Sequence, residues 1–319
     1  MQKILVTGGA GFIGSATAKK LIERGDKVVI IDNFNDYYNP KLKEDRIKIF
    51  LKGYKFKLYR GDIRDEKILE KIFRKEKIDK VVHLAAMAGV RYSFEKPLLY
   101  GEVNFMGTLN MLEFSKKYKI KNFIYASSSS VYGANKKIPF SESDRVDNPI
   151  STYAATKKAT ELMAYMYSHT HGLKTTGLRF FTVYGPWGRP DMAYFKFTNL
   201  ISNGKPIEVY NNGKMMRDFT YIDDIVDGIL KVLDADMQCE IMNIGADKPE
   251  KLDKFIQVLE RNIGKIAKKK MMPMQKGDVL KTMADVKKLK KLGWKPTIGI
   301  EVGIKNFIEW YKEYYQVIK

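Results

Sequence analysis

Short runs of consecutive apolar residues recur along the first half of the chain, and longer segments with an apolar residue every three or four positions separate them. A short continuous run is typical of a strand buried on both faces, whereas the longer period is typical of a helix with one buried face. Strands that alternate with helices in this rhythm form a parallel, doubly wound α/β sheet. The runs predict strands at residues 3–7, 27–31, 55–59, 80–84, 122–126 and 174–179.

The periodic segments predict helices between these strands. A further helix should begin with Ser151 or Thr152 as its cap, because a hydroxyl can accept a hydrogen bond from the first turn. In the last third of the chain, short elements and loops rich in Gly, Pro and Asn replace the rhythm. We therefore expect a large domain at residues 1–181 and a smaller C-terminal α/β domain, which would bind the substrate, at residues 182–319. The helices of the large domain are predicted at residues 12–24, 41–52, 66–75 and 98–118.

The composition is that of an ordinary globular protein. Of the 319 residues, 45% are hydrophobic and 29% are charged. No apolar run approaches the ~20 residues that a membrane-spanning helix needs, and the first residues show no cleavable signal pattern. A lone cysteine, Cys239, leaves no intrachain disulfide and no plausible metal cluster. We expect a cytoplasmic protein that binds neither a metal nor a membrane.

The formal net charge of +20 raises the possibility of a nucleic-acid partner. The basic residues are scattered along predicted helices and mixed with acids, and the densest runs, at residues 268–270 and 287–291, are short and lack interleaved aromatic residues. This distribution favours a lysine-rich solvated surface over a nucleic-acid interface. The excess positive potential would also attract an anionic substrate.

A glycine-rich run follows the first predicted strand and opens the first predicted helix. Gly8, Gly11 and Gly14 would let the backbone approach a pyrophosphate, whose charge the helix N-terminus would meet. Asp32 ends the second strand, where a carboxylate can accept hydrogen bonds from an adenosine ribose and repel a 2′-phosphate. The run predicts a Rossmann site that prefers NAD to NADP; a tight turn without a ligand is the alternative.

Tyr153 and Lys157 lie four residues apart and therefore share one face of a predicted helix. An ammonium one turn from a phenol should lower the pKa of the tyrosine, as a general base for an alcohol proton requires. Such a pair occurs by chance on many helices. Together with the dinucleotide site and with Ser128, at the end of a predicted strand, it predicts hydride chemistry on a secondary alcohol.

At these motifs the chain resembles the extended short-chain dehydrogenase/reductases. Within them it is most similar to nucleotide-sugar 4-epimerases, and closest to UDP-glucuronate 4-epimerases. The resemblance extends from Lys3 to about Trp310, and its most specific parts are residues 32–38, 88–93 and 179–192. It implies bound NAD, a UDP-sugar substrate, a homodimer, and a strand near residues 240–244 that returns to the large sheet.

The resemblance also implies roles for individual residues. Ser128, Tyr153 and Lys157 match the catalytic set. The implied cofactor-binding residues are Gly8, Gly11, Phe12, Ile13, Gly14, Asp32, Asn33, Asp62, Ile63, Leu84, Ala85, Ala86, Asn104, Tyr153 and Lys157. The implied substrate-binding residues are Arg91, Ser128, Ser130, Thr182, Arg189, Arg217 and Asp278.

Arg189 and Thr182 are the candidates for binding a sugar carboxylate, since an arginine fork can hold a carboxylate through two hydrogen bonds. Arg91 is a further candidate for this role, and a loop salt bridge is the structural alternative for Arg189. Arg217 resembles the residue that holds the nucleotide diphosphate, and Asp278 resembles the contact to the uridine ribose. His83 is expected to have a packing or hydrogen-bonding role.

Ser130 stands where related sugar dehydratases and UDP-glucuronate decarboxylases carry an acid. Without that acid, an oxidised sugar would more easily take its hydride back, which favours epimerisation. A UDP-glucose/UDP-galactose 4-epimerase remains the main alternative. A UDP-glucuronate decarboxylase and a non-catalytic NAD-binding regulator are more distant ones, although a regulator would not need the complete set of Ser128, Tyr153 and Lys157.

Overall fold

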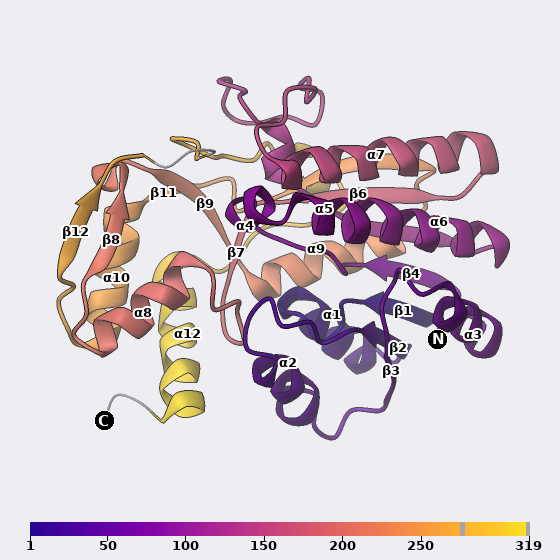
Figure 1. The fold of residues 1–319 in the computed structure, drawn as a ribbon, viewed down its shortest axis with the longest axis horizontal. Helices are drawn as coiled ribbons and strands as arrows, with labels where there is room; N and C mark the ends of the chain where they lie inside the picture. The colour runs from indigo at the N-terminus through magenta and orange to yellow at the C-terminus, as the bar shows by residue number, and fades with distance from the viewer. Residues whose placement is uncertain (275–277, 317–319) are drawn as a thin grey trace.

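A parallel sheet of seven strands forms the centre of the computed structural model, which describes residues 1–274 and 278–316 (Figure 1). The strands are β1 (Lys3–Thr7), β2 (Lys27–Asp32), β3 (Phe56–Arg60), β4 (Lys80–His83), β5 (Asn122–Ser128), β6 (Thr175–Phe180) and β10 (Cys239–Ile244). Their order, β10-β6-β5-β4-β1-β2-β3, confirms the predicted doubly wound fold. From β1 the strands continue through β2 to β3 on one side, and from β4 they continue through β5 and β6 to β10 on the other. The carboxyl ends of β1 and β4 therefore form a topological switch point, where such sheets bind ligands.

Helices cover both faces of this sheet (Figure 1). One face carries α1 (Phe12–Glu23) and α9 (Ile222–Asp234), and the other carries α3 (Glu66–Glu76), α6 (Gly107–Lys117) and α7 (Thr152–His171). Successive strand residues point to opposite faces. Ile4 and Val6 of β1 accordingly bury in the core beneath α1 and α9, and Leu5 buries in the core beneath α3, α6 and α7.

Two of the predicted helices contain π-helical turns. Residues 41–52 form α2 (Lys41–Asp45) followed by the turn η1 (Arg46–Phe50). The helix predicted at residues 98–118 is present as a continuous helix that contains a π-helical turn. After α4 (Val90–Glu95), the segment consists of α5 (Pro97–Tyr100), the π-helical turn η2 (Gly101–Met106) and α6. Turns of this kind are frequent at functional sites, and both lie close to the cleft described below.

The C-terminal elements form two small sheets with helices against them. The elements are β7 (Thr182–Tyr184), α8 (Ala193–Ser202), β8 (Ile207–Tyr210), η4 (Asn211–Gly213), β9 (Met216–Tyr221), β11 (Pro249–Lys251), α10 (Leu252–Ile263), β12 (Lys269–Met272), α11 (Lys287–Lys290) and α12 (Ile300–Tyr315). One sheet has the order β11-β9-β7 and the other pairs β12 with β8. The division at residues 181 and 182 stays a prediction, since one continuous core joins the two parts.

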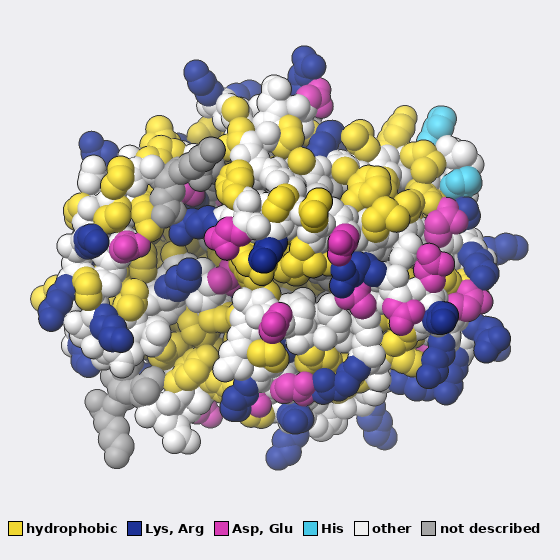
Figure 2. Space-filling view, viewed as in Figure 1, with side chains coloured by type: hydrophobic (Ala, Val, Ile, Leu, Met, Phe, Trp, Pro, Cys, Tyr) yellow, Lys and Arg dark blue, Asp and Glu magenta, His cyan; other side chains and the backbone are white. Residues whose placement is uncertain are grey.

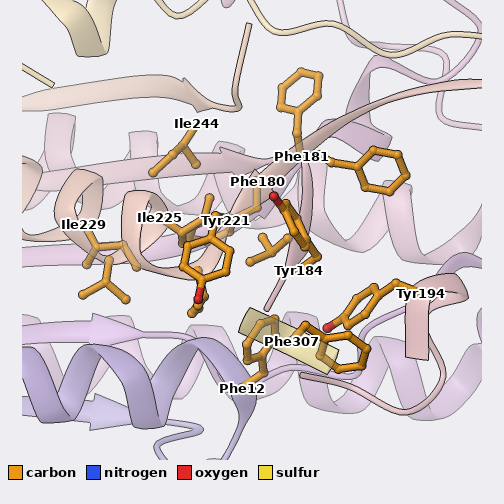
Figure 3. Close-up of a cluster of buried hydrophobic side chains, with 14 of the residues drawn as sticks. Phe12, Phe180, Phe181, Tyr184, Tyr194, Tyr221, Ile225, Ile229, Ile244 and Phe307 are labelled. Atoms are coloured by element: carbon orange, nitrogen blue, oxygen red, sulfur yellow. The ribbon is translucent and has the colours of Figure 1, made fainter. Parts of the chain in front are cut away.

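Aromatic side chains dominate this shared core (Figure 3). Phe307 of α12 meets Tyr194 of α8 edge to face, with ring centroids 4.8 Å apart. The same buried cluster includes Tyr184 of β7 and Phe12, the first residue of α1. Edge-to-face contact is a favourable geometry for aromatic pairs. The segment between β7 and α8 is therefore flanked by well-packed aromatic residues, close to the first turn of α1.

The surface carries its positive charge in dispersed form. In Figure 2, lysine and arginine side chains are interspersed with aspartate and glutamate over the visible face. Lys116 and Lys117, for example, pair with Glu113 and Glu70. None of the described helices combines the length and apolarity needed to cross a membrane.

Candidate active site

A cleft lies at the carboxyl ends of β1, β2, β4 and β5, at this switch point. It encloses about 1370 Å³ of empty space, part of which is open to solvent. Most of the residues predicted from the sequence to bind the cofactor or to react line this cleft. They are Gly8, Gly11, Phe12, Ile13, Gly14, Asp32, Asn33, Asp62, Ile63, Leu84, Ala85, Ala86, Ser128, Tyr153 and Lys157. Arg189, which was predicted to bind the substrate, also lines the cleft.

The glycine-rich turn is packed so tightly that side chains would not fit. Gly8 has a φ of +67°, and a Cβ there would lie 2.8 Å from the backbone nitrogen of Ala85. A Cβ on Gly14 would collide with the carbonyl oxygen of Gly8. The helix that follows, α1, has no side-chain cap and no acidic residue in its first turn. Its first N–H groups are therefore available to an anion, which is the requirement for binding a pyrophosphate.

Asp32 is buried at the end of β2, with 7% of its surface exposed. One carboxylate oxygen accepts a hydrogen bond from the Ala10 nitrogen at 3.0 Å, and the other accepts one from the Phe34 nitrogen at 2.8 Å. The remaining lone pairs can accept ribose hydroxyls. Asp62, at the end of β3, accepts from Asn33 at 2.8 Å. These residues fit an adenosine that carries free ribose hydroxyls.

The catalytic candidates meet at the junction of β5 and α7. Ser151 caps α7, as predicted, by accepting a hydrogen bond from the Ala154 nitrogen at 3.1 Å. Lys157 is buried, and its Nζ donates to the carbonyl oxygen of Ala126 at 2.7 Å. Ser130 donates to the hydroxyl of Ser128 at 2.7 Å, and Ser128 itself lines the cleft.

The predicted lowering of the Tyr153 pKa was wrong for the protein alone. Burial raises the pKa of Tyr153, and the nearby Ser128 hydroxyl and Arg189 charge oppose this rise without reversing it. Burial also lowers the pKa of Lys157 to about 8. Desolvation disfavours the charged form of both groups, and it outweighs the attraction that their spacing on the helix led us to expect.

Two buried polar residues support the walls of the cleft. Asn104 of η2 accepts a hydrogen bond from the Met87 nitrogen at 2.8 Å and donates to the Met87 oxygen at 3.0 Å and to Thr156 at 3.1 Å. His83 bonds to the hydroxyls of Thr7 at 2.7 Å and Thr108 at 3.1 Å. Burial lowers the pKa of His83 to about 3, so its ring is neutral. The predicted structural role of His83 is confirmed.

Arg189 faces the cleft as part of an ion pair. Its Nε and one terminal nitrogen donate to the two carboxylate oxygens of Asp191, at 3.0 and 2.6 Å. The Tyr37 hydroxyl donates to the same carboxylate at 3.2 Å, and the Tyr37 ring lies 5.8 Å from the guanidinium. The second terminal nitrogen of Arg189 has no hydrogen-bond partner among the described residues. Our sequence reasoning assigned no role to Tyr37 or Asp191, although both lie in the specific runs that it singled out.

A second polar group joins Arg91 of α4 to residues from the C-terminal part of the chain. The guanidinium of Arg91 is 3.7 Å from the Asp278 carboxylate and lies over the ring of Tyr210, 5.1 Å from its centroid. Burial lowers the pKa of Arg217, and the charge of Asp278 opposes this shift. The structure thus brings together three of the predicted substrate residues, apart from the cleft lining.

Thr182 and Ser130 are not part of the cleft lining formed by the described residues. Thr182 is half-buried on β7, and Ser130 reaches the site through Ser128. The sequence analysis missed Lys43, a buried cleft residue that donates to the backbone and side-chain oxygens of Asn35 at 2.8 and 2.9 Å. Among the described residues, no cluster of His, Cys, Asp or Glu could hold a metal ion.

The switch-point cleft, the glycine turn and the Tyr153–Lys157 pair define an extended short-chain dehydrogenase/reductase. Residues 4–245 match the NAD dependent epimerase/dehydratase family, and the chain belongs to that family. The family is described as NAD dependent, which confirms the cofactor predicted from the sequence.

Several relatives cover almost the whole chain. A probable UDP-glucuronate 4-epimerase of Rhizobium meliloti is 43% identical over 335 residues, which cover 99% of this chain and 98% of the relative. The crystal structure of UDP-glucuronic acid 4-epimerase from Bacillus cereus, in complex with UDP-glucuronic acid and NAD, is similar with a TM-score of 0.92 and 36% identity, over 98% of this chain and 100% of that one. A UDP-glucose 4-epimerase from Thermotoga maritima, with UDP-glucose, has a TM-score of 0.90 and 33% identity, over 98% and 99%.

The charge of Asp32 should set the choice of dinucleotide. We expect the protein, once freed of any copurifying nucleotide, to bind NAD at least ~100-fold more tightly than NADP, because a buried carboxylate repels the 2′-phosphate. Asp32→Asn keeps the shape and removes the charge, so it should narrow this ratio. Isothermal titration with both dinucleotides measures it, and Asp36→Asn, an exposed acid of the same loop, is the control. Equal affinity of the unmodified protein for NAD and NADP would contradict the assignment.

Proposed function

We propose that the protein is a UDP-glucuronate 4-epimerase, which interconverts UDP-glucuronate and UDP-galacturonate through a 4-keto sugar. The observation that carries this proposal is the position of Arg189, whose guanidinium lines the cleft close enough to Tyr153 to affect its pKa. A cation at that point suits a sugar with a carboxylate next to the reacting carbon. The similarity to full-length UDP-glucuronate epimerases supports the same substrate.

In the proposed reaction Tyr153 accepts the proton of the sugar 4-hydroxyl. Bound NAD would accept the C4 hydride and later return it. Because burial raises the pKa of Tyr153 in the protein alone, its ionisation depends on the positive charge around it. Arg189 already contributes such charge, and the Lys157 ammonium lies one helical turn away. The Ser128 hydroxyl would hydrogen-bond to the sugar oxygen as its charge develops.

Epimerisation requires that the keto sugar turn over between the two hydride transfers. Arg217, Arg91 and Asp278 are grouped away from the cleft lining, where they would hold the nucleotide while the sugar rotates about its diphosphate link. Ser130 supplies no carboxyl group for elimination or for protonation of a decarboxylated enolate. The 4-keto sugar would therefore regain its hydride, on either face, rather than follow another route.

A 4-keto uronate is a β-keto acid, which loses carbon dioxide when its carboxylate bond stands perpendicular to the carbonyl plane. Arg189 and Thr182 would hold the carboxylate away from that orientation. The second terminal nitrogen of Arg189 is the donor that remains for this task while Asp191 occupies the rest of the fork.

A UDP-glucose 4-epimerase is the second candidate, and a specific observation favours it. Asp191 already neutralises Arg189, so the cleft presents a paired charge that a neutral hexose also tolerates. Incubation with a panel of UDP-sugars, with NMR identification of the products, separates the two functions. Conversion of UDP-glucose with no conversion of UDP-glucuronate would replace our proposal by this one.

Tyr153→Phe should reduce turnover of UDP-glucuronate by about 1000-fold, the scale of a lost acid–base group. The phenyl ring retains the packing of the tyrosine, so NAD binding and thermal stability should change little. NMR of the uronic acid products and a titration with NAD provide the two measurements. A variant that keeps most of its activity would remove Tyr153 from the mechanism.

Arg189→Ala should reduce kcat/KM for UDP-glucuronate by about 100-fold, because the substrate carboxylate loses a charged partner. The effect on any turnover of UDP-glucose should be much smaller. The fraction of pentose product should rise, since a loosely held carboxylate can rotate into the orientation that releases carbon dioxide. Arg189→Lys should not restore the unmodified behaviour, because lysine lacks the planar fork.

The control for this experiment concerns Asp191, which Arg189→Ala leaves as an unpaired, largely buried acid. The double variant Arg189→Ala, Asp191→Ala removes both members of the pair. If the double variant still loses kcat/KM for UDP-glucuronate but not for UDP-glucose, the loss is due to the missing contact between Arg189 and the substrate carboxylate. Equal losses on both sugars, with no added pentose, would make Arg189 a structural residue and direct the search for the carboxylate contact to Arg91.

We further propose that the protein acts in the cytoplasm as a homodimer through the outer face of α5, η2 and α7. Large apolar side chains are exposed there, and Figure 2 shows apolar side chains gathered over this part of the surface. On α7 these are Leu162, Tyr165 and Met166. Exposed apolar patches of this kind mark surfaces at which proteins associate. The commonest symmetric homo-oligomer is a dimer in which the same face of each subunit is paired.

Leu162→Lys should convert the dimer to a monomer, because a charge would be buried at the centre of the pairing face. Sedimentation velocity measures the change. Val302→Lys, at an exposed apolar position of α12, is the matched control and should leave the dimer intact. Sedimentation of the unmodified protein as a monomer would contradict the assignment of this face.

A further inference from the structure

Arg46, the first residue of η1, is fully buried and uses every donor of its guanidinium. Its Nε donates to the Trp187 oxygen at 2.9 Å, and one terminal nitrogen donates to the oxygens of Trp187 and Gly188 at 2.7 and 3.0 Å. The other terminal nitrogen donates to the Ala10 oxygen at 3.1 Å and to the Tyr38 hydroxyl at 2.7 Å. Arginine has five N–H donors, so five hydrogen bonds saturate the group.

The acceptors of Arg46 are three backbone carbonyls and a phenol. No carboxylate of the described residues lies within ion-pair distance of Arg46. A buried charge without a partner of opposite sign is costly to retain. These hydrogen bonds hold three separate segments of the chain together, two through backbone carbonyls and one through the Tyr38 phenol, and this gain would offset the cost.

Each of these segments contributes a residue to the cleft lining, namely Gly11, Tyr38 and Arg189. Ala10 belongs to the glycine-rich turn of the cofactor site. Tyr38 follows Tyr37, which bonds to Asp191. The carbonyls of Trp187 and Gly188 belong to the two residues that precede Arg189. A single guanidinium thus touches the cofactor turn and the segment that carries the uronate-binding candidate.

The backbone before Arg189 needs such support. Trp187 has a φ of +61°, in the left-handed region that bulky side chains rarely adopt. The Trp187 ring packs against α12. Its centroid lies 5.3 Å from that of Trp310 and 5.0 Å from that of Tyr314. The aromatic contacts fix the ring, whereas Arg46 fixes the direction of the two carbonyls and hence of the chain that enters Arg189.

We propose that Arg46 is a positioning residue for carboxylate recognition, which holds the backbone of Trp187 and Gly188 so that Arg189 faces the sugar beside the cofactor turn. The proposal rests on the proposed function, since it concerns the same sugar carboxylate. It assigns to Arg46 no contact with substrate or cofactor. Its effect on carboxylate recognition is exerted through Arg189.

The test compares Arg46→Lys and Arg46→Met with the unmodified, NAD-loaded protein. Calorimetric titrations with UDP-glucuronate, UDP-glucose and UDP give the affinity for the carboxylate separately from that for the nucleotide. We expect the preference for UDP-glucuronate over UDP-glucose to fall by about 10-fold, the scale of one weakened charge-assisted hydrogen bond. Affinity for UDP should be almost unchanged, and the pentose fraction of the product should rise. Lysine should not restore the preference, because one ammonium cannot span the three segments.

Leu51→Ala is the matched control, since Leu51 is buried just beyond η1 and has no hydrogen bond to the segment before Arg189. It should lower the melting temperature without changing the preference between the two sugars. Tyr38→Phe, which removes one of the four acceptors, is the milder second probe. It should shift the preference in the same direction as Arg46→Lys, by a smaller factor, if the Arg46 variants do not fold.

Two results would overturn the inference, and they differ from each other. Arg46 or Tyr38 variants that lose affinity for both sugars equally, as a destabilised protein would, make Arg46 a purely structural residue and leave the proposed function intact. An unmodified protein that shows no preference for UDP-glucuronate refutes the proposed function, and the role of Arg46 falls with it.

Discussion

The close approach of β1 and β4 at their carboxyl ends is the constraint on which the site depends. Gly8 leaves room for the backbone at Ala85, and Thr7 fastens the two strands by accepting hydrogen bonds from the nitrogens of Leu84 and Ala85, both at 3.1 Å. The neutral ring of His83 bonds to the same threonine. Because the chain leaves these strands in opposite directions, their ends open into a cleft with the cofactor turn on one side and the catalytic helix on the other.

Local sequence patterns were sufficient for six strands of the large sheet and for the cofactor end of the cleft, whereas β10 was expected only from the family resemblance. Strand and helix periods are set by neighbours in the chain, and the glycine turn and Asp32 lie within one βαβ unit. The π-helical turn inside the helix at residues 98–118 could not be foreseen, since it accompanies contacts of Asn104 with Met87 and Thr156, which are distant in sequence. The residues of the site were therefore easier to predict than the local backbone geometry of the segments that carry them.

The electrostatics of the site were harder to predict than its membership. The spacing of Tyr153 and Lys157 indicates their proximity but not how deeply α7 buries them, and burial decides the direction of the tyrosine pKa. Arg189 was identified as a cleft residue, whereas its pairing with Asp191 depends on how the loop after β7 folds back on itself. The role of Arg46 was invisible in the sequence, because its four acceptors are spread over 179 positions, from Ala10 to Gly188.

An epimerase has to release one face of the sugar in order to present the other, so its contacts with the sugar must be weaker than its contacts with the nucleotide. The distribution of charge matches this requirement. Arg91 and Arg217 are grouped around one acid, Asp278, which leaves net positive charge for a diphosphate. Near Tyr153, by contrast, Arg189 is matched by Asp191. A carboxylate that approaches this neutral pair gains a hydrogen bond without the full attraction of a bare cation, since Asp191 repels it. Such a pair can orient the uronate during each hydride transfer and still let it leave while the sugar turns.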